Sequence, residues 1–297
     1  MLDILSFQLV SQLLINGILF GTMYGIAAIG LSLIYGTMRI IFLAQGTIII
    51  FLAYICYWFF KLLGIDPYLS ILLVVPVSLL LGMGFYQGLF REAAALEDKN
   101  ISLLIAVGLM FLVENLMATM WSSNPRSIMT SYTAYGVSTL GLRISFTRLM
   151  GFIMAVLSTI GVNLFLNKTL VGKAVKAASE DMEAAALVGI SPHAVNGVAF
   201  AIGIGLAGTA GVALATTYSF DPYFGFIFAL KAMIALALGG MGSVTGAFLG
   251  GILLGVLESV GSFVISGGWA DAISYGVFLI VLMFKPEGLF VRSVKKA

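Results

Sequence analysis

Long runs of apolar residues alternate with short polar connections along this chain, and the alternation predicts its secondary structure. Most runs reach the roughly 20 residues that a helix needs to cross the hydrocarbon of a bilayer, although the run at 226–241 is marginal. Backbone groups in lipid must bond internally, and no ten-residue alternating pattern typical of a β-barrel occurs. We therefore predict an all-α bundle of eight or nine spans at residues 9–36, 39–60, 68–90, 101–121, 147–166, 193–217, 226–241, 243–264 and 270–285.

Composition points to the same class. The 297 residues are 61% hydrophobic and 9% charged, whereas soluble domains carry about 25% charged residues. Such a chain cannot cover a water-facing surface, so its spans are expected to face membrane lipid. The longest polar connections run about 25 residues, so residues 1–297 are expected to form a single transmembrane domain. Nothing indicates a nucleic-acid partner, a bound cofactor or a metal site.

The lysines and arginines of the short loops predict the orientation in a cell membrane, because cytoplasmic loops carry the excess of these residues. One side collects ten of them, and the other collects Lys61, Arg126, Arg143 and Arg148. The richer side is predicted to be cytoplasmic and includes the C-terminus; nine spans would then place the N-terminus outside. Its members are Arg39, Arg91, Lys99, Lys168, Lys173, Lys176, Lys285, Arg292, Lys295 and Lys296.

The chain has 35 glycines, many of them at four-residue spacing inside the spans. This spacing places glycines on one helix face, where neighbouring backbones can approach closely. The first interpretation is that these faces only pack tightly against neighbouring helices. The second is that some of them line or gate a transport pathway. The three ladders are Gly17, Gly21 and Gly25; Gly242, Gly246 and Gly250; and Gly251 and Gly255.

Two glycine-rich connections near opposite ends of the chain resemble each other, namely "LIYGTMRIIFLAQG" (33–46) and "LALGGMGSVTGAFLGG" (236–251). Transporters often contain internal repeats with broken helices at the transport site. We therefore expect a possible internal repeat, with a pathway or helix break at Gly36, Gln45, Gly46, Gly239, Gly240, Gly242 and Gly246.

Four charged residues, Glu114, Lys231, Glu258 and Asp271, fall within or at the edges of apolar runs, where charges are costly and tend to be paired or functional. Lys231 and Glu258 flank the break at 241–242, and at 1.5 Å per residue they would lie near the same ends of neighbouring helices. We expect an ion pair between them; the alternative is that each side chain reaches the interface separately. No nucleophile–base pair is present, so the chain is not expected to be an enzyme.

The connection at 167–192, "NKTLVGKAVKAASEDMEAAALVGISP", is both charged and helix-prone. Ser179 is expected to cap one helix of about nine residues, which Gly189 would end, and Pro192 would open the next span. A face formed by Met182, Ala185, Ala186 and Val188 would then lack partners within the loop. A groove on a soluble protein partner would bury it.

Several motifs resemble one known family. "EAAALVG" (183–189) matches the EAA signature of bacterial ABC-importer permeases, while "LGGMGSVTGAFLGGILLGVLE" (238–258), "FKPEGLF" (284–290) and the first span resemble the branched-chain amino-acid permeases of the LivH type. The likeness runs from about residue 10 to 290, and the short N-terminus is typical of the LivH-like rather than the LivM-like branch. It implies that a coupling helix docks on an ATPase through Glu180, Asp181, Met182, Glu183, Ala184, Ala185, Ala186 and Gly189.

The resemblance further implies an assembly of two permeases, this one and a homologous LivM-like subunit or a second copy of it, two cytoplasmic ATPases and an extracytoplasmic solute-binding protein. The binding protein would dock on the outer loop 122–147, where Arg126, Arg143 and Arg148 offer positive charge. One departure concerns the substrate, because "FLAQG" at 42–46 followed by Thr47 replaces the family's more polar Asn-Phe-Ala-His-Gly and acid.

The sequence is compatible with three hypotheses for the function. The first is an ABC permease for branched-chain or similar amino acids, with amides, urea or sugars as other possible solutes. The second is an ion-coupled secondary transporter, which needs an intramembrane carboxylate cluster and no ATPase-docking loop. The third is an assembly subunit without a pathway.

Overall fold

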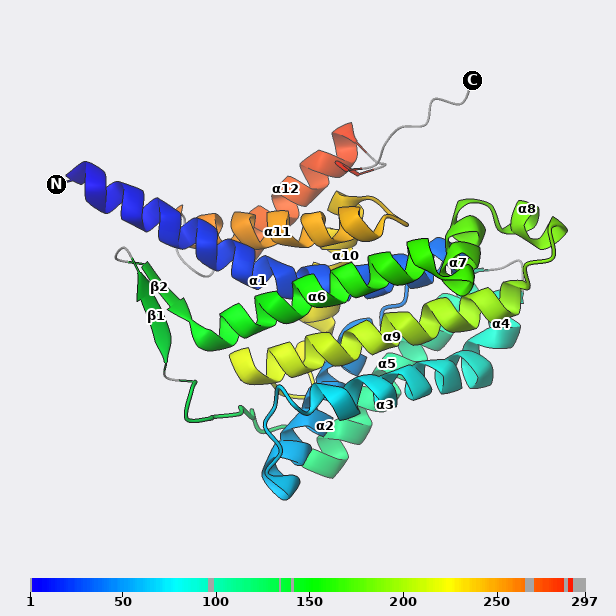
Figure 1. The fold of residues 1–297 in the computed structure, drawn as a ribbon, viewed down its shortest axis with the longest axis horizontal. Helices are drawn as coiled ribbons and strands as arrows, with labels where there is room; N and C mark the ends of the chain where they lie inside the picture. The colour runs from blue at the N-terminus through cyan, green and yellow to red at the C-terminus, as the bar shows by residue number, and fades with distance from the viewer. Residues whose placement is uncertain are drawn as a thin grey trace.

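The computed structural model describes residues 2–95, 99–133, 135–139, 142–264, 270–285 and 288–290. The described chain is a helical bundle with one small β-hairpin (Figure 1). Its elements are α1 (Leu2–Met38), α2 (Gln45–Leu63), α3 (Ile71–Phe85), the π-helical turn η1 (Tyr86–Phe90), α4 (Arg91–Ala95), α5 (Lys99–Trp121), β1 (Gly136–Thr139), β2 (Leu142–Ser145), α6 (Phe146–Lys168), α7 (Leu170–Glu180), α8 (Met182–Leu187), α9 (Pro192–Thr217), α10 (Phe224–Gly239), α11 (Val244–Val264) and α12 (Ala270–Phe284).

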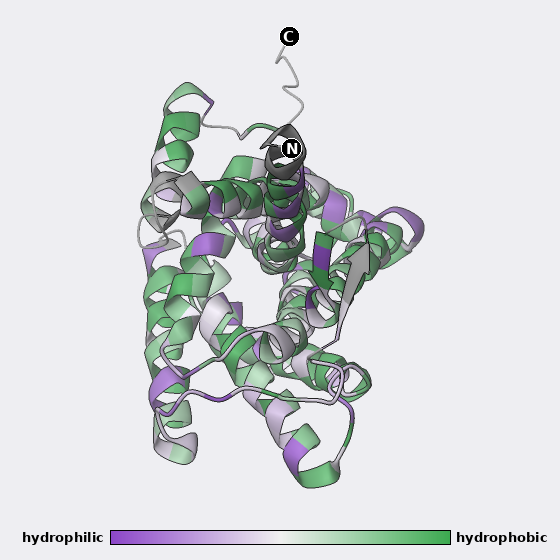
Figure 2. Cartoon of the chain, turned by 90° about the vertical axis from the view of Figure 1, so that its left-hand side faces the viewer, coloured by the Kyte–Doolittle hydropathy of each residue, from purple (hydrophilic) through white to green (hydrophobic). Residues whose placement is uncertain are grey.

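The predicted all-α membrane bundle is confirmed. Seven helical stretches are long and apolar enough to cross a membrane, and the apolar helices at Phe224–Gly239 and Tyr275–Phe284 are shorter. Hydrophobic positions predominate along the helices when the molecule is viewed from the side of its N-terminus (Figure 2). The pattern did not predict the antiparallel hairpin of β1 and β2, in which Val137 pairs with Ile144 within the polar connection 122–147.

Helices α1 and α9 form the centre of the bundle, since 89% of the residues in the most apolar stretch of each are buried. The corresponding fractions are 22% for the α3–α4 stretch and 28% for α6, which places these helices at the rim. Leucines such as Leu72, Leu80 and Leu104 remain more than two-thirds exposed on the rim helices. In a bundle of this composition, such side chains face lipid rather than water.

Glycine lets the central helices touch through their backbones. A Cβ atom added at Gly21 of α1 would lie 2.6 Å from the Cα of Ile252, and one added at Gly255 of α11 would collide with Gly21. On the other side of α11, Gly250 meets Gly239 of α10 in the same manner. Small residues at four-residue spacing thus bring the backbones together. The interpretation as packing faces is confirmed for the glycines within α1 and α11, but not for Gly242, which lies in the turn before α11 and makes no close backbone contact.

The two glycine-rich connections differ in shape. Helices α10 and α11 pack against each other as a tight hairpin, whereas α1 and α2 share few contacts and α2 packs mainly on α9, α10 and α5. Both connections lie between helices, so neither interrupts a span. Arg39 directly follows α1 with a positive φ of 56°, and the chain then crosses to α2 through the buried residues Ile40 and Phe42.

The bundle has two distinct ends, named here by the elements that mark them. The α7–α8 end carries the C-terminus of α1, helix α4 and the α10–α11 connection, and the β-hairpin end carries the N-terminus of α1 and strands β1 and β2 (Figure 1). Arg39 lies at the α7–α8 end, where its Nη2 donates to the carbonyl of Ser179. Of the predicted basic side, Arg292, Lys295 and Lys296 lie outside the described residues, as do Pro286 and Glu287 of "FKPEGLF".

Candidate functional site

The charged connection at 167–192 folds into two helices, so the prediction of one helix capped by Ser179 is wrong. Thr169 caps α7 by accepting a hydrogen bond of 2.9 Å from the amide of Gly172. Asp181 caps α8 by accepting one of 2.9 Å from the amide of Ala184, while the hydroxyl of Ser179 donates to Lys176 inside α7. The helix-forming alanines extend α7 through Ser179, and the carboxylate of Asp181 then starts α8 favourably at the positive end of its dipole.

The predicted end of this segment is confirmed. Gly189 follows α8 with φ of 90°, its amide donates to Ala186, and the amide of Ile190 donates to Ala185 at 3.1 Å. This arrangement closes the last turn of a helix through a glycine in a conformation that other residues adopt only with strain. Pro192 then occupies the first turn of α9, so only four residues separate the end of α8 from the next helix.

The exposed face of α8 agrees with the predicted one at Ala186 and Val188 but differs from it at Met182 and Ala185. Ala185 is buried and Met182 packs against the core, because α7 lies beneath α8 and supplies the partners that the sequence alone did not reveal. The exposed apolar side chains are Leu187 and Val188, at 89% and 78% of their full areas. Together with the exposed residues Asp181, Glu183, Ala184 and Ala186 they form what we call the α8 tip.

Helix α7 anchors the α8 tip to the bundle. It contacts α1, α6 and α9, and it buries Gly172, Val175 and Ala178 against them. Gly36 of α1 connects this anchor with the α10–α11 turn, because a Cβ added at Gly36 would lie 3.3 Å from the Cβ of Ser179 and 3.7 Å from the Cα of Gly242. Gly36 therefore lies between α7 and the turn that joins α10 to α11.

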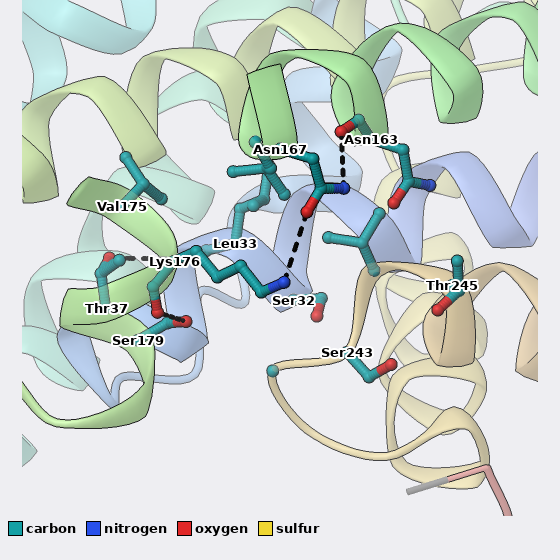
Figure 3. A pocket seen from close by; sticks show the side chains of 13 residues that line it. Ser32, Leu33, Thr37, Asn163, Asn167, Val175, Lys176, Ser179, Ser243 and Thr245 are labelled. Carbon is teal, nitrogen blue, oxygen red and sulfur yellow. Dashed lines mark hydrogen bonds between the residues drawn. The ribbon is translucent and has the colours of Figure 1, made fainter. Parts of the chain in front are cut away.

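A polar pocket of about 290 Å³ lies beside α7. Lys176 of α7 donates to Asn167 of α6 at 3.3 Å, and Asn167 donates to the carbonyl of Asn163 (Figure 3). Among the described residues the hydroxyl of Ser32, which is buried, has no hydrogen-bond partner. Helices α1, α6, α7 and α11 all contribute to the lining, which is Ser32, Leu33, Thr37, Asn163, Leu166, Asn167, Val175, Lys176, Ser179, Gly242, Ser243, Val244 and Thr245.

The candidate break residues do not form a single site. Gly242 lines the pocket beside α7, while Gly239, Gly240 and Gly246 shape the α10–α11 turn, in which Gly240 has φ of 102°. Gln45 and Gly46 lie apart from them in the first turn of α2. The Gln45 side chain is fully buried and donates to the carbonyl of Gly203 in α9, and Gly46 packs against Gly225 and Ala229 of α10.

A second group of polar residues lies within the bundle on its β-hairpin side. The Nζ of Lys231 on α10 lies 2.5 Å from Oε1 of Glu258 on α11, and it also donates to the hydroxyl of Tyr24 on α1 at 3.4 Å. The side chains of Lys231 and Glu258 are 12% and 24% exposed, so neither extends fully to the surface. The structure thus brings together the two charges that the spacing had placed at neighbouring helix ends.

Next to this pair is a pocket of about 430 Å³ that sequence reasoning missed. Arg148 was assigned to an outer loop, but it belongs to the first turn of α6 and donates to Asn16 of α1 at 3.2 Å. Asn16 is the polar residue in the run "LLINGIL", a signal that was available in the sequence. The pocket is lined by Leu13, Asn16, Phe20, Tyr24, Arg148, Tyr218, Gly255, Glu258, Ser259 and Ser262.

The three arginines predicted for the outer loop have different surroundings. Arg126 is partly buried, donates to the carbonyl of Trp121 at 2.6 Å and lies over the rings of Tyr57 and Trp58. Arg143 in β2 is exposed. At the same end Tyr132 donates to Asp66 at 2.7 Å, and burial together with this carboxylate raises the pKa of the Tyr132 phenol well above its usual range.

The described residues thus form a polytopic helical bundle with a short capped helix at one end and polar pockets between its helices, an arrangement typical of a membrane permease. Residues 13–282 match the family model described as "Branched-chain amino acid transport system / permease component", and the chain belongs to this family. It is 31% identical to the high-affinity branched-chain amino acid transport system permease protein BraD of Pseudomonas aeruginosa, over 95% of each chain.

Other relatives agree with this assignment. LivH of Escherichia coli, a permease protein of the same kind of transport system, is 27% identical over 95% of each chain. LivM of the same organism is 32% identical over half of this chain and 34% of its own length. Among solved structures, PsaBC from Streptococcus pneumoniae in complex with Fab has a similar fold, with a TM-score of 0.52 and 13% identity over 93% of this chain and 92% of that one.

Proposed function

We propose that this chain is the permease subunit of an ATP-driven ABC importer, and that it carries branched-chain or similar amino acids into the cytoplasm. The family membership and the similarity to the branched-chain amino acid permeases BraD and LivH support the transport role. The observation that carries the coupling to ATP is the α8 tip, where Leu187 and Val188 expose apolar surface on a capped six-residue helix. A groove on an ATPase subunit would bury this surface.

The transport cycle we propose uses α7 as a lever. Two cytoplasmic ATPase subunits would close on ATP and pull the α8 tips of two permease subunits, this one and either a LivM-like partner or a second copy. Because α7 packs on α1, α6 and α9 and meets the α10–α11 turn through Gly36, its motion would pass to the helices that line both pockets. The pathway would then open alternately to the two sides of the membrane.

The proposal includes an orientation of the chain in the membrane and a third kind of partner, a solute-binding protein. The excess of lysine and arginine on the basic side of the sequence supports a cytoplasmic α7–α8 end and C-terminus for a protein of the inner (plasma) membrane. An extracytoplasmic solute-binding protein would dock at the β-hairpin end, within 122–147. Arg143 is the arginine best exposed for contact with acids on such a protein, since Arg126 and Arg148 are partly buried.

Reconstitution of the whole assembly tests the proposed function. The chain would be co-expressed with its partner permease, ATPases and binding protein, purified, and placed in liposomes to measure ATP-dependent uptake of labelled leucine, isoleucine and valine. Leu187→Glu should abolish ATPase co-purification and uptake, because a carboxylate cannot be buried in an apolar groove without a large cost. Leu62→Glu, at a site 72% exposed at the opposite end of the bundle, is the matched control.

Two outcomes would contradict the proposal. One is uptake by the chain alone, driven by an ion gradient without the ATPases, which would indicate a secondary transporter. The other is full ATPase binding and uptake by Leu187→Glu, which would remove the docking role of the α8 tip. Uptake of an amide, urea or a sugar in place of amino acids would support the ATP-driven importer but contradict the proposed solute.

A further inference from the structure

The pocket of about 430 Å³ on the β-hairpin side combines opposite charges with aromatic walls. Arg148 and Glu258 both line it, and so do the rings of Phe20, Tyr24 and Tyr218. The rings of Phe20 and Tyr218 lie 5.6 Å apart, and the Arg148 guanidinium lies 4.2 Å from the centre of the Phe20 ring. Its volume falls in the range of about 300–1,000 Å³ that is typical of small-molecule sites.

The two charges in this pocket are incompletely satisfied by the protein. Among the described residues Arg148 forms no ion pair; its neighbours are the Asn16 amide and the Phe20 ring. The Oε2 of Glu258 is buried without a hydrogen-bond partner among the same residues, while Oε1 holds Lys231. Charges removed from water are usually paired, so a cation and a carboxylate oxygen in one pocket indicate a ligand that carries both complementary charges.

Other pockets lack this combination. The one beside α7 contains Lys176 among hydroxyls and amides but no carboxylate. The pocket under the β-hairpin is lined by Arg143 and Arg148 without an acid. The pocket under the β-hairpin shares Asn16 and Arg148 with the 430 Å³ pocket. The two pockets therefore adjoin at the β-hairpin end, where a solute would arrive in the proposed function.

We propose that the 430 Å³ pocket is a binding site for the zwitterionic head group of an α-amino acid, on the outer half of the transport pathway. Arg148 binds the carboxylate, for which its planar fork is suited, and Glu258 accepts hydrogen bonds from the ammonium. The side chain of the amino acid packs among Leu13, Phe20 and Gly255. This inference rests on the proposed amino-acid transport, and it adds the residues that recognise the solute within the permease itself.

In the empty site, Lys231 takes the place of the ammonium group of the solute. Its ammonium contacts Glu258 and lies 5.4 Å from the centre of the Tyr24 ring, so it holds the carboxylate in place before a solute arrives. The ammonium of the amino acid would share or take over this carboxylate. Because the competing interaction weakens binding, the solute can leave the site again, which transport requires.

Alkylation of a reporter cysteine tests occupancy directly. Ser262→Cys would be introduced in the pocket and the buried Cys56 changed to Ala, in the complete assembly in liposomes without binding protein. Millimolar leucine should slow alkylation of the reporter. Leucinamide, which lacks the carboxylate, and 2-hydroxy-4-methylpentanoate, which lacks the ammonium, should each protect about tenfold less, as expected for loss of a charged hydrogen-bond partner.

Variants of the charged residues make the test specific. Arg148→Gln should remove protection by leucine, and Arg148→Lys should restore part of it. Glu258→Gln alone removes the ion pair with Lys231, so this single variant can fail to fold. The double variant Glu258→Gln with Lys231→Met replaces both charges by neutral side chains, and it should also lose protection by leucine. Glu114→Gln, which neutralises another carboxylate within the apolar spans but outside this pocket, is the control and should keep full protection.

The outcomes separate this inference from the proposed function. If the assembly imports leucine but leucine does not protect the reporter, or leucinamide protects equally well, the site is not an amino-acid site and the transport role stands. Unchanged protection in Arg148→Gln also overturns the inference. If the assembly imports no amino acid at all, the proposed function fails first.

Discussion

At the scale of single residues, the backbone conformation of Gly189 determines which substitutions this position tolerates. It has φ of 90°, and nothing lies within 4 Å of a Cβ placed on it. A side chain therefore meets no steric obstacle, but it imposes the backbone strain of a left-handed conformation, about 1–2 kcal/mol. The strain falls on the turn that sets the direction of the α8 tip. Gly64 has the same combination, with φ of 64° and open space, at the other end of the bundle.

Gly189→Asp should leave the protein inserted in the membrane while it loses ATPase association and uptake. The strained turn would redirect Leu187, and the new carboxylate would add to the charges of Asp181 and Glu183. Membrane yield, ATPase co-purification and uptake would be measured together. Gly64→Asp imposes the same kind of strain far from α8 and should keep its ATPase; normal uptake in Gly189→Asp would contradict the docking role.

At the scale of elements, the contact between α1 and α11 depends on the absence of side chains. Gly17, Gly21, Gly251 and Gly255 allow backbone approach so close that any Cβ on these positions overlaps the opposite helix. In lipid, where apolar side chains gain little by leaving one apolar surface for another, close packing supplies much of the association energy. The interface therefore tolerates substitution less than its apolar character suggests.

Gly21→Val should destabilise the folded protein by about 1–3 kcal/mol or more, as overpacking does, because neither backbone can move without disturbing the central helix α1. Thermal aggregation in detergent, followed by size-exclusion chromatography, measures the loss. Gly84→Val is the matched control, since a Cβ at Gly84 meets nothing within 4 Å. A Gly21→Val protein as stable as the control would show that α1 and α11 are less tightly packed than described.

The same elements show how far sequence reasoning reaches. Apolar length alone located the spans, and four-residue glycine spacing located the packing faces of α1 and α11, because both are local patterns with a direct physical cause. The pairing of these two faces came from the structure. The burial of Ala185 was missed because it depends on α7, a helix whose own start at Thr169 was not recognised. Arg148 was misplaced for a related reason. Its pocket is built from α1, α6, α11 and Tyr218, which directly follows α9, and no local pattern encodes the proximity of residues so distant in sequence.

At the scale of the whole molecule, function requires that the two ends of the bundle face different compartments. In the proposed function, the α8 tip meets ATP-hydrolysing subunits in the cytoplasm, while Arg143 and the β-hairpin meet the solute-binding protein outside. The segments that carry these roles protrude from opposite ends (Figure 1). The excess of lysine and arginine on the basic side of the sequence predicts a cytoplasmic location for the α7–α8 end.

Cysteine labelling of intact cells tests this assignment. In a protein with Cys56→Ala, Met129→Cys and Leu187→Cys would each place one reporter at a residue that is 80% and 89% exposed, respectively. A membrane-impermeant maleimide should label Met129→Cys in intact cells and Leu187→Cys only after the membrane is opened, with the order reversed in inside-out vesicles. Labelling of Leu187→Cys from outside would place the α8 tip beyond the reach of any cytoplasmic ATPase, and the proposed coupling would have no physical route.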